Sequence, residues 1–255
     1  GMQRDYWYSA ARDPEALANA EDVGRIAAER TVNRLGSRKG KTQRSPIIFA
    51  APIAGTLIRH LLSAVSGGAL YRKASFLLDS LGEQLFPDFI NISEKPHLHR
   101  GVASASFDSD GVATVEKDII SGGVLSSYLL NSYAARRLNM ESSGNGGGAR
   151  NVRVNSSKSA DSKLSLKDML QDMDRGFLVT ELMGQGVNGI TGDYSRGAAG
   201  FWVDGGEIVY PIDELTIAGN LKDMFKQIVS VGTDVDCRGN IQSGSILLES
   251  MSLAS

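Results

Sequence analysis

The stretch that decides the fold runs from Phe177 to Tyr210 and reads FLVTELMGQGVNGITGDYSRGAAGFWVDGGEIVY. It opens with an apolar run that contains β-branched residues, and it closes with Phe201-Trp202-Val203 before Asp204-Gly205-Gly206. Because glycine adopts positive φ without steric cost, this pattern predicts a central strand, a long glycine-rich loop from Gly184 to Gly200, and a hairpin.

Polar side chains concentrate in this predicted loop, where a rigid sheet would present them to a ligand or a partner. The candidate binding residues are Gly184, Gly186, Thr191, Asp193, Tyr194, Ser195 and Arg196. A purely structural role, as a bend between strands, is an equally open interpretation of the glycines.

A phosphate-binding role for the loop is disfavoured. Gly184-Gln-Gly-Val-Asn-Gly189 matches the G-x-G-x-x-G pattern after a strand-like segment. The dinucleotide fingerprint, however, needs its third glycine to open a helix that faces the phosphates. The following residues, Ile190 to Gly197, have no helical periodicity, so nucleotide binding is not expected.

The composition indicates a globular chain of nearly neutral charge. Its 255 residues are 42% hydrophobic, which is enough for the core of one large domain or two small ones, and 29 glycines indicate many turns. The net charge is −2, so nucleic acid binding would need a local patch. Arg38, Lys39, Lys41 and Arg44 form a candidate patch, but a solvated loop before a strand is the favoured interpretation.

Several features predict a cytoplasmic protein without a membrane anchor. No apolar run approaches the roughly 20 residues of a membrane helix, and the N-terminus has no basic-then-apolar secretory pattern. The single cysteine, Cys237, excludes an intrachain disulfide framework and fits a reducing compartment. Gly1 before Met2 indicates either a cloning remnant or a start inside a longer protein.

Periodicity, capping residues and turn residues predict the elements of the chain. Helices are expected over 13–36, 53–65, 132–138, 165–176 and 221–231, and a further apolar segment over 75–86 has Ser75 as a candidate N-cap. Strands are expected over 46–50, 89–93, 152–154 (at a sheet edge), 215–219 and 245–248, with an antiparallel meander over 103–130 and a serine-rich loop from Asn155 to Lys163. The predicted fold class is α+β, with antiparallel sheets packed by helices.

The chain lacks a complete catalytic or metal-binding motif. No His-Glu pair and no G-x-S-x-G elbow occurs, and Gly40-Lys41-Thr42 lacks the earlier glycine of a phosphate-binding loop. His97 and His99 could share a metal only with a third ligand from elsewhere, so ordinary loop histidines are favoured. His60 is interpreted as a packed or surface residue of a helix. We therefore expect no catalytic residue and no metal ligand in this chain.

Long uninterrupted segments carry more information than these short patterns. They are residues 2–6, 71–73 with 76–82, 180–186, 191–202 and 216–224. In these segments the sequence resembles the TldD/PmbA family, and in particular its PmbA (TldE) branch. The resemblance covers nearly the whole chain. It implies that residues 1–255 are mainly the C-terminal TldD/PmbA domain, with residues 1–45 as a helical lead-in from a missing N-terminal domain.

The resemblance also implies a function. Members of this branch are expected to be the subunit without zinc in a metallopeptidase complex, in which a TldD-like partner carries zinc on a His-Glu-x-x-x-His helix. A homodimer is the other assembly considered. The implied substrates are short or unfolded peptides, including a peptide-antibiotic leader and a labile antitoxin. This chain is not expected to be catalytic alone or to hold a cofactor.

The resemblance gives the loop residues a specific expected role in contacting peptide or partner. Asp193 and Arg196 would orient polar groups of the peptide or pair across the subunit interface, while an internal Asp193–Arg196 pair that fixes the loop is an equal alternative. Sheet edges could accept an extended peptide as an added strand. The alternative function is a nucleic-acid or gyrase-associated binding module that uses the basic patch over 38–44, although the net acidity disfavours nucleic acid.

Overall fold

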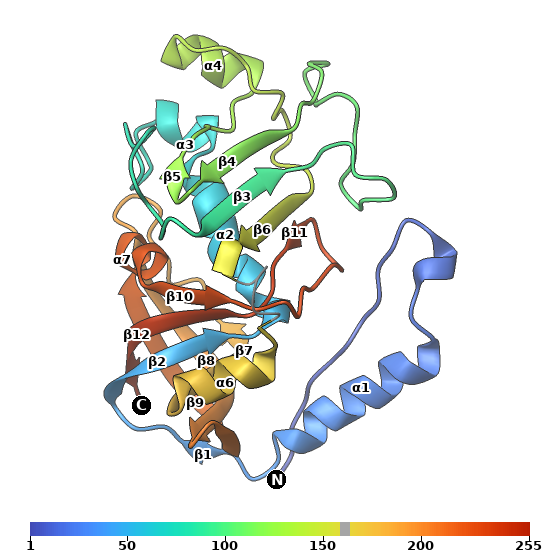
Figure 1. Ribbon diagram of the computed structural model, residues 1–255, viewed down its shortest axis with the longest axis vertical. Coiled ribbons are helices and arrows are strands. Elements are labelled where there is room, and N and C mark those ends of the chain that lie inside the picture. Colours follow the sequence, from blue (N-terminus) through green and yellow to red (C-terminus); the bar gives the residue numbers. More distant parts are fainter. Residues whose placement is uncertain (159–163) are drawn as a thin grey trace.

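The structure, a computed structural model, describes residues 1–158 and 164–255, and within them the strands form two sheets. The larger sheet occupies the lower half of Figure 1 and the smaller sheet the upper half. The order in the larger sheet is β1 (Arg38–Lys39), β9 (Glu207–Asn220), β8 (Asp193–Asp204), β7 (Gly176–Met183), β2 (Gln43–Phe49), β12 (Ile246–Ala254) and β10 (Ile228–Val231). The order in the smaller sheet is β11 (Ile241–Gln242), β6 (Val152–Ser156), β3 (Ile90–Glu94), β4 (Lys117–Ser121) and β5 (Val124–Leu125).

The larger sheet closes on itself. β12 pairs with β2 on one side and with the second half of β9 on the other, where Leu253 is opposite Ile217. The ring β9–β8–β7–β2–β12 therefore has no free long edge, and β1 and β10 are short strands added to it. Closure satisfies the backbone groups of the longest strands and removes the edges that would otherwise pair with other chains.

Helices of modest length pack around these sheets. The described helices are the 3₁₀ helix η1 (Pro14–Ala16) and the α-helices α1 (Ala20–Asn33), α2 (Ala51–Ala64), α3 (Gly67–Tyr71), α4 (Ser132–Leu138), α6 (Leu166–Met173) and α7 (Leu221–Lys226). The predicted fold class is confirmed, with sheets and packed helices as expected. The sheets also contain parallel pairs, β1–β9, β2–β7 and β6–β11, which join segments that are distant in sequence.

α2 connects the two sheets and positions the site. Its apolar residues Ala54, Leu57 and Leu61 recur at helical spacing, and all are buried in one core with residues of both sheets. The helix has no side-chain cap of its own. Instead the Ala51 amide donates to Ser245 Oγ at 3.0 Å, and that hydroxyl donates to Asp234 Oδ2 at 2.6 Å. An acceptor and a carboxylate at this end satisfy the first turn and complement the helix dipole.

Strand residues alternate between two apolar layers. Ile47 and Phe177 belong to the main core, whereas their neighbours Ile48 and Leu178 belong to a second cluster under α6. The predicted N-cap Ser165 is confirmed, because Ser165 and Asp168 form a reciprocal capping box at the start of α6. The period-two alternation therefore explains why one strand supports helices on both of its faces.

The predicted glycine loop is shorter in the structure than in the sequence analysis. β8 already begins at Asp193 and pairs with β7 and β9, so Gly197 and Gly200 are strand residues and the loop spans 184–192. A Cβ on Gly200 would overlap the carbonyl oxygen of Leu178. The glycine is needed there for close strand packing, whereas Gly205 and Gly206 do form the predicted turn, with φ of 62° and 74°.

Five other parts of the chain differ from the predictions. Within the predicted meander over 103–130 only β4 and β5 are strands, and Phe107 and Ala113 form an isolated bridge. Residues 75–86 form turns and no helix, because Asp79 and Gly82 take left-handed φ values of 55° and 86°. The helix predicted over 221–231 ends after α7, and β-branched residues continue as β10 beside β12. The helix predicted over 13–36 divides into η1 and α1, capped by Asp13 and Asn19. The strand at 152–154 is not at an edge, because β11 pairs with it.

The predicted serine-rich loop from Asn155 to Lys163 lies partly outside the described residues. Its first residues continue β6.

The N-terminal segment before β1 lies beside the sheets and touches them at a few points. None of the residues of α1 is buried, and Figure 1 shows this helix separated from the two sheets. At its C-terminal end Arg34 forms ion pairs with Glu181 at 2.5 Å and Asp213 at 3.4 Å. Trp7 lies between two guanidinium groups, with Arg238 3.7 Å and Arg30 5.1 Å from the ring centroid. Charge and cation–π contacts therefore hold this segment in place.

Candidate functional site

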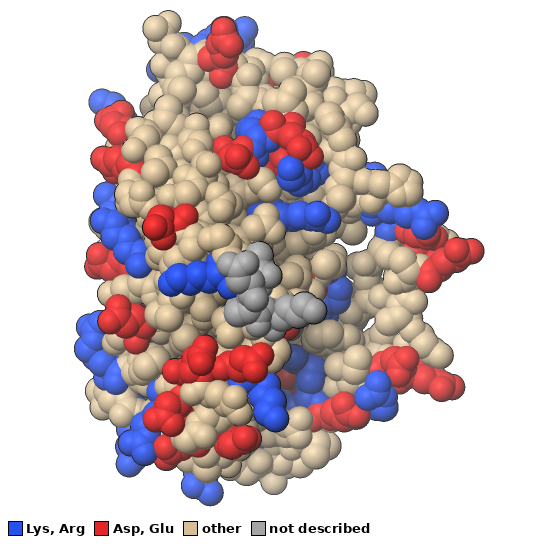
Figure 2. All heavy atoms as spheres, viewed as in Figure 1, with Lys and Arg blue, Asp and Glu red and all other residues tan. Residues whose placement is uncertain are grey.

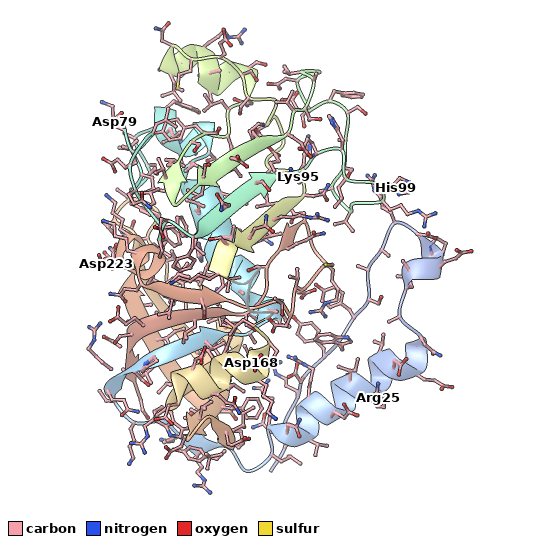
Figure 3. All side chains as sticks on the ribbon, in the orientation of Figure 1. Arg25, Asp79, Lys95, His99, Asp168 and Asp223 are labelled. Atoms are coloured by element: carbon pink, nitrogen blue, oxygen red, sulfur yellow. The ribbon has the colours of Figure 1, made fainter. Side chains whose placement is uncertain are left out.

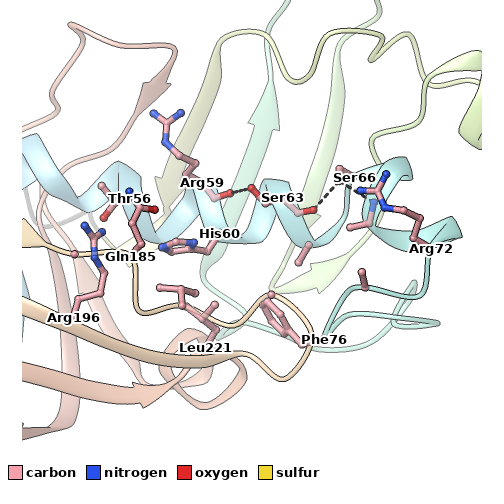
Figure 4. A pocket seen from close by; sticks show the side chains of 16 residues that line it. Thr56, Arg59, His60, Ser63, Ser66, Arg72, Phe76, Gln185, Arg196 and Leu221 are labelled. Carbon is pink, nitrogen blue, oxygen red and sulfur yellow. Dashed lines mark hydrogen bonds between the residues drawn. The ribbon is translucent and has the colours of Figure 1, made fainter.

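A cavity of about 570 Å³ lies along one side of α2. One wall is α2 itself, and the others are the loop before β8, the start of β8, and the segment from Ser66 to Phe76. Figure 4 shows His60 projecting from α2 toward the loop that carries Gln185, with Arg196 and Arg72 toward opposite ends of the view. The central stretch identified from sequence thus contributes the loop and strand that face this cavity.

β8 divides the predicted binding residues between its two faces. Tyr194 is buried and Arg196 is half-buried on the side of α2, whereas Asp193 and Ser195 are exposed. Arg196 lines the cavity along α2, while Asp193 and Ser195 line a separate, more open hollow beside the loop. This division follows from the strand period of two. The seven predicted residues are therefore near one another in the chain but do not share one surface.

Asp193 is held by its own neighbours. Its carboxylate accepts hydrogen bonds from Thr191 Oγ1 at 2.6 Å and Asn220 Nδ2 at 3.2 Å. The Thr191 hydroxyl, followed by the Asn220 amide, lowers the pKa of Asp193. Among the described residues Asp193 forms no ion pair with Arg196, so the predicted internal Asp193–Arg196 pair is wrong. The two side chains point to opposite faces of β8.

The glycines of the loop allow it to pack closely against β8. Ser195 donates its amide hydrogen to the Gly186 carbonyl at 2.6 Å, and a Cβ on Gly186 would overlap the carbonyl oxygen of Ser195. Gly184 has a φ of 74°, which other residues rarely adopt. Both predicted glycines therefore have a structural role, and Gly184 also lines the cavity along α2.

The cavity is strongly positive. Arg59, Arg72 and Arg196 line it, and no Asp or Glu is among its described lining residues. Arg72 stacks on Tyr71, 5.3 Å from the ring centroid. The Nε atom of Arg196 is buried without a hydrogen-bond partner in the described part of the chain. Arg59 and Arg72 are exposed and Arg196 is half-buried, so the attraction for an anion is strongest beside Arg196, where less water screens the charge.

The acidic side chains of the adjoining cavity do not neutralise this charge. A cavity of about 270 Å³ shares Thr56 and Arg196 with the one along α2 and is lined by Asp5 and Glu181. Asp5 pairs with Arg30 at 3.2 Å, and Glu181 pairs with Arg34. Both carboxylates therefore already have cationic partners.

His60 is a site residue, although its sequence context predicts a packed or surface residue of a helix. Its ring meets the Tyr194 ring edge to face, with centroids 5.9 Å apart, and its Nε2 is buried without a partner among the described residues. Burial lowers the pKa of His60, and the charges of Arg196 and Arg59 lower it further. The imidazole is therefore neutral near pH 7, with one ring nitrogen available to accept a proton or a hydrogen bond.

Tyr194 supports this imidazole. Burial raises the pKa of the Tyr194 hydroxyl to about 12, and the charge of nearby Arg196 opposes part of that rise. The phenol therefore stays protonated at every physiological pH. The sequence could not predict that His60, Arg59 and Arg72 lie near Arg196, because α2, α3 and β8 come together only in the folded chain.

The residues at this site do not fit a zinc ion. His60 is the one imidazole on the cavity wall, its described neighbours include two guanidinium groups, and a divalent cation would be repelled there. Within the described residues no group of three or more His, Cys, Asp and Glu could hold a metal. His97 donates to or accepts from Thr114 Oγ1 at 3.1 Å, and Figure 3 places His99 on an outer loop.

The basic patch considered for nucleic acid is partly engaged within the chain. Arg38 stacks on Tyr210 at 4.6 Å from the ring centroid, and Arg44 donates to Ser250 Oγ at 3.3 Å. Figure 2 shows acidic and basic side chains interspersed over the visible face. No helix among the described residues is long and apolar enough to cross a membrane.

The closed sheet, the bridging helix and the cavity define a known class of domain. The chain belongs to the PmbA/TldA metallopeptidase C-terminal domain family, whose model matches residues 42–255. Metalloprotease PmbA of Escherichia coli O157:H7 is 53% identical to it over 253 residues, which are 99% of this chain and 55% of that protein. The chain thus spans about half the length of the curated relatives it matches.

Solved structures show the same fold. A protein of Bacteroides thetaiotaomicron named for modulation of DNA gyrase has a TM-score of 0.91 at 26% identity, over 98% of this chain and 55% of that one. TldE from Thermococcus kodakarensis has a TM-score of 0.81 at 26% identity, over 96% of this chain and 57% of that one. The predicted family resemblance, including the PmbA/TldE branch, is confirmed.

Proposed function

We propose that this chain is the non-zinc-bearing subunit of a TldD/TldE-type metallopeptidase complex, in which it forms a wall that holds short unfolded peptides. The observation that carries the proposal is the peptide-sized cavity along α2, lined by Arg59, His60 and Arg196 and without a set of metal ligands in the described residues. The family assignment supports a role for this wall in a peptidase, and so do the names of the relatives, metalloprotease PmbA and TldE.

The proposed division of labour follows from the side chains. The TldD-like partner would supply zinc and the chemistry of peptide hydrolysis, while this chain binds and orients the peptide. The cavity is lined by α2 from Thr56 to Ala64, a stretch of about 12 Å at 1.5 Å per residue. That length accommodates about four residues of extended peptide. Antibiotic leaders and labile antitoxins are the kinds of substrate we propose, in the cytoplasm.

The proposed peptide path runs along α2 more readily than along a sheet edge. The free edges among the described strands are β1, β5, β10 and β11, which have two to four residues each. Such short strands offer few hydrogen bonds to an added strand. The layout that we propose keeps residues 1–45 as a lead-in from a further N-terminal domain, in line with the greater length of the relatives.

Reconstitution tests this function. The chain would be mixed with a zinc-loaded TldD-like subunit and an unfolded peptide, with light scattering to detect the complex and mass spectrometry to follow cleavage. We expect a stable complex that cleaves the peptide faster than the TldD-like subunit alone. The variant Arg196→Gln should slow cleavage without preventing assembly, and the exposed Arg25→Gln should change neither. Absence of a complex together with no increase in cleavage would overturn the proposal.

A further inference from the structure

The positive charge of the cavity along α2 is not balanced by acidic side chains in the part of the chain that the structure describes. Among the described residues, Arg59, Arg72 and Arg196 form no ion pair with a carboxylate, although the chain contains 29 acidic residues. Surface guanidinium groups often remain unpaired in water, but Arg196 is half-buried and its Nε has no partner. A buried donor is stabilised when it meets an acceptor, so the Nε of Arg196 is available to donate to an incoming group.

The geometry of the wall points to an elongated anionic ligand. Arg196 on β8, Arg59 and His60 on α2, and Arg72 after α3 line one cavity from end to end. Arg59 also lines a second cavity of about 440 Å³ on the other side, together with Asn131 and Asn145. Figure 4 shows Arg196 and Arg72 toward opposite ends of the view, with Arg59 and His60 on opposite sides of α2 between them. Separated charges suit several acidic groups on one chain better than a single compact ion.

We propose that this cavity is a carboxylate-recognition subsite for acidic peptide segments. Guanidinium groups bind carboxylates through two parallel hydrogen bonds, which gives direction as well as charge complementarity. The carboxylates have two possible sources, Asp and Glu side chains or the C-terminal carboxylate of the peptide. This inference rests on the proposed function in one respect, which is that the ligand is a peptide.

His60 makes the subsite responsive to the bound anion. The neutral imidazole lies against the Tyr194 ring and is near enough to Arg196 and Arg59 for their charges to lower its pKa. A carboxylate that binds beside it offsets the repulsion by the two guanidinium groups, so the imidazole can then take up a proton. Binding should therefore raise the pKa of His60, and it should become tighter as the pH falls.

A set of matched octapeptides tests the proposal on the 255-residue chain. One carries three Glu and a C-terminal amide, one carries three Gln and a free carboxylate, and one carries three Gln and an amide. Binding would be measured by fluorescence anisotropy at low salt and again at 0.5 M salt. We expect the Glu peptide to bind at least tenfold more tightly than the neutral amide, with most of the difference lost at high salt.

The three peptides separate the sources of the carboxylate. A gain for the Glu peptide alone assigns the subsite to acidic side chains, and a gain for the free carboxylate alone assigns it to peptide C-termini. Equal binding of all three peptides would overturn the proposal, as would tighter binding of a phosphorylated oligonucleotide of the same charge, which would indicate nucleic acid.

Variants connect the effect to the named residues. Arg196→Gln and Arg59→Gln should each weaken binding of the Glu peptide about tenfold and leave the neutral amide unchanged, whereas Arg25→Gln on α1 should have no effect. Because circular dichroism and melting temperature report folding separately, a folded Arg196→Gln variant with full selectivity would contradict the inference. If all three peptides bind equally well while the reconstituted complex cleaves peptide at the normal rate, this inference is overturned and the proposed function is not. Selective binding without complex formation would overturn the proposed function alone.

Discussion

At the scale of single residues, His60 is the side chain whose environment differs most from its sequence interpretation. A lone histidine on an apolar helix face is usually a packing residue, and nothing in the neighbouring sequence marks it otherwise. Its importance arises from Arg196, which is more than 130 positions away and approaches through β8. Tyr194 and Arg196 were predicted as binding residues, but the side of the strand on which they lie could not be predicted while residue 193 was placed in a loop.

The lowered pKa of His60 makes the stability of the fold depend on pH. Because the unfolded imidazole titrates near 6.5 and the folded one titrates lower, the unfolded state binds more protons between these values. Stability is therefore complete above about pH 6.5 and decreases as the pH falls toward the folded pKa. Thermal melts between pH 5 and 7.5 should show a steeper loss for the wild type than for His60→Gln. Parallel profiles would contradict this, as would an NMR titration of His60 at or above 6.5.

Gly186 and Gly189 form a matched pair of positions in one loop. A Cβ at Gly186 would overlap the Ser195 carbonyl, whereas a Cβ at Gly189 would meet no atom within 4 Å, and neither residue has a positive φ. We expect Gly186→Ala to lower the free energy of unfolding by about 1–3 kcal/mol, because the loop must move away from β8. Gly189→Ala should stay within about 0.5 kcal/mol. Urea denaturation measures both, and equal effects would argue against the close return of the loop.

At the scale of elements, local signals predicted more than the pairing did. The helix at 132–138 and the cap at Ser165 were predicted correctly, because apolar spacing and capping residues act within one turn. The helix predicted over 221–231 was too long, because its last residues include β-branched ones that fit a helix or a strand equally well. Only their pairing with β12 makes them a strand. Likewise, β6 could not be recognised as an interior strand, because its neighbour β11 lies about 90 residues later in the chain.

The junction at the start of α2 is testable at this scale. Ser245 is fully buried, accepts from the Ala51 amide and donates to Asp234, so it joins β12 to the helix that forms the cavity wall. Ser245→Ala leaves the amide and the carboxylate without this partner, and should cost about 1–3 kcal/mol in the free energy of unfolding. The exposed Ser126→Ala should cost less than about 0.5 kcal/mol. Chemical denaturation measures both variants. An unchanged free energy of unfolding for Ser245→Ala would contradict the role of Ser245 in joining β12 to α2.

At the scale of the whole molecule, a small cluster of charges holds the N-terminal segment to the sheets. Arg34 has 10% of its side chain exposed and contacts Glu181 and Asp213, which belong to β7 and β9. We expect Arg34→Ala to loosen the segment, because the contacts that remain, such as Trp7 with Arg238 and Gln3 with Asp213, are few. Chymotrypsin should then cleave faster after the exposed Tyr6 and Tyr8. The control Arg25→Ala, at a residue labelled in Figure 3, removes only two surface ion pairs on α1 and should not alter the rate.

The neighbours of β2 have a consequence for how the chain folds. β2 pairs with β12, so Phe49 lies opposite Ile246, almost 200 positions later, and its other partner β7 is also distant. Chains dominated by such distant pairings reach the native state slowly, because long segments must be brought together before the contacts repay the lost entropy. We therefore expect the ring of strands to be completed late in folding, and until then the apolar residues Ile47 to Phe49 are open to chaperones and to self-association.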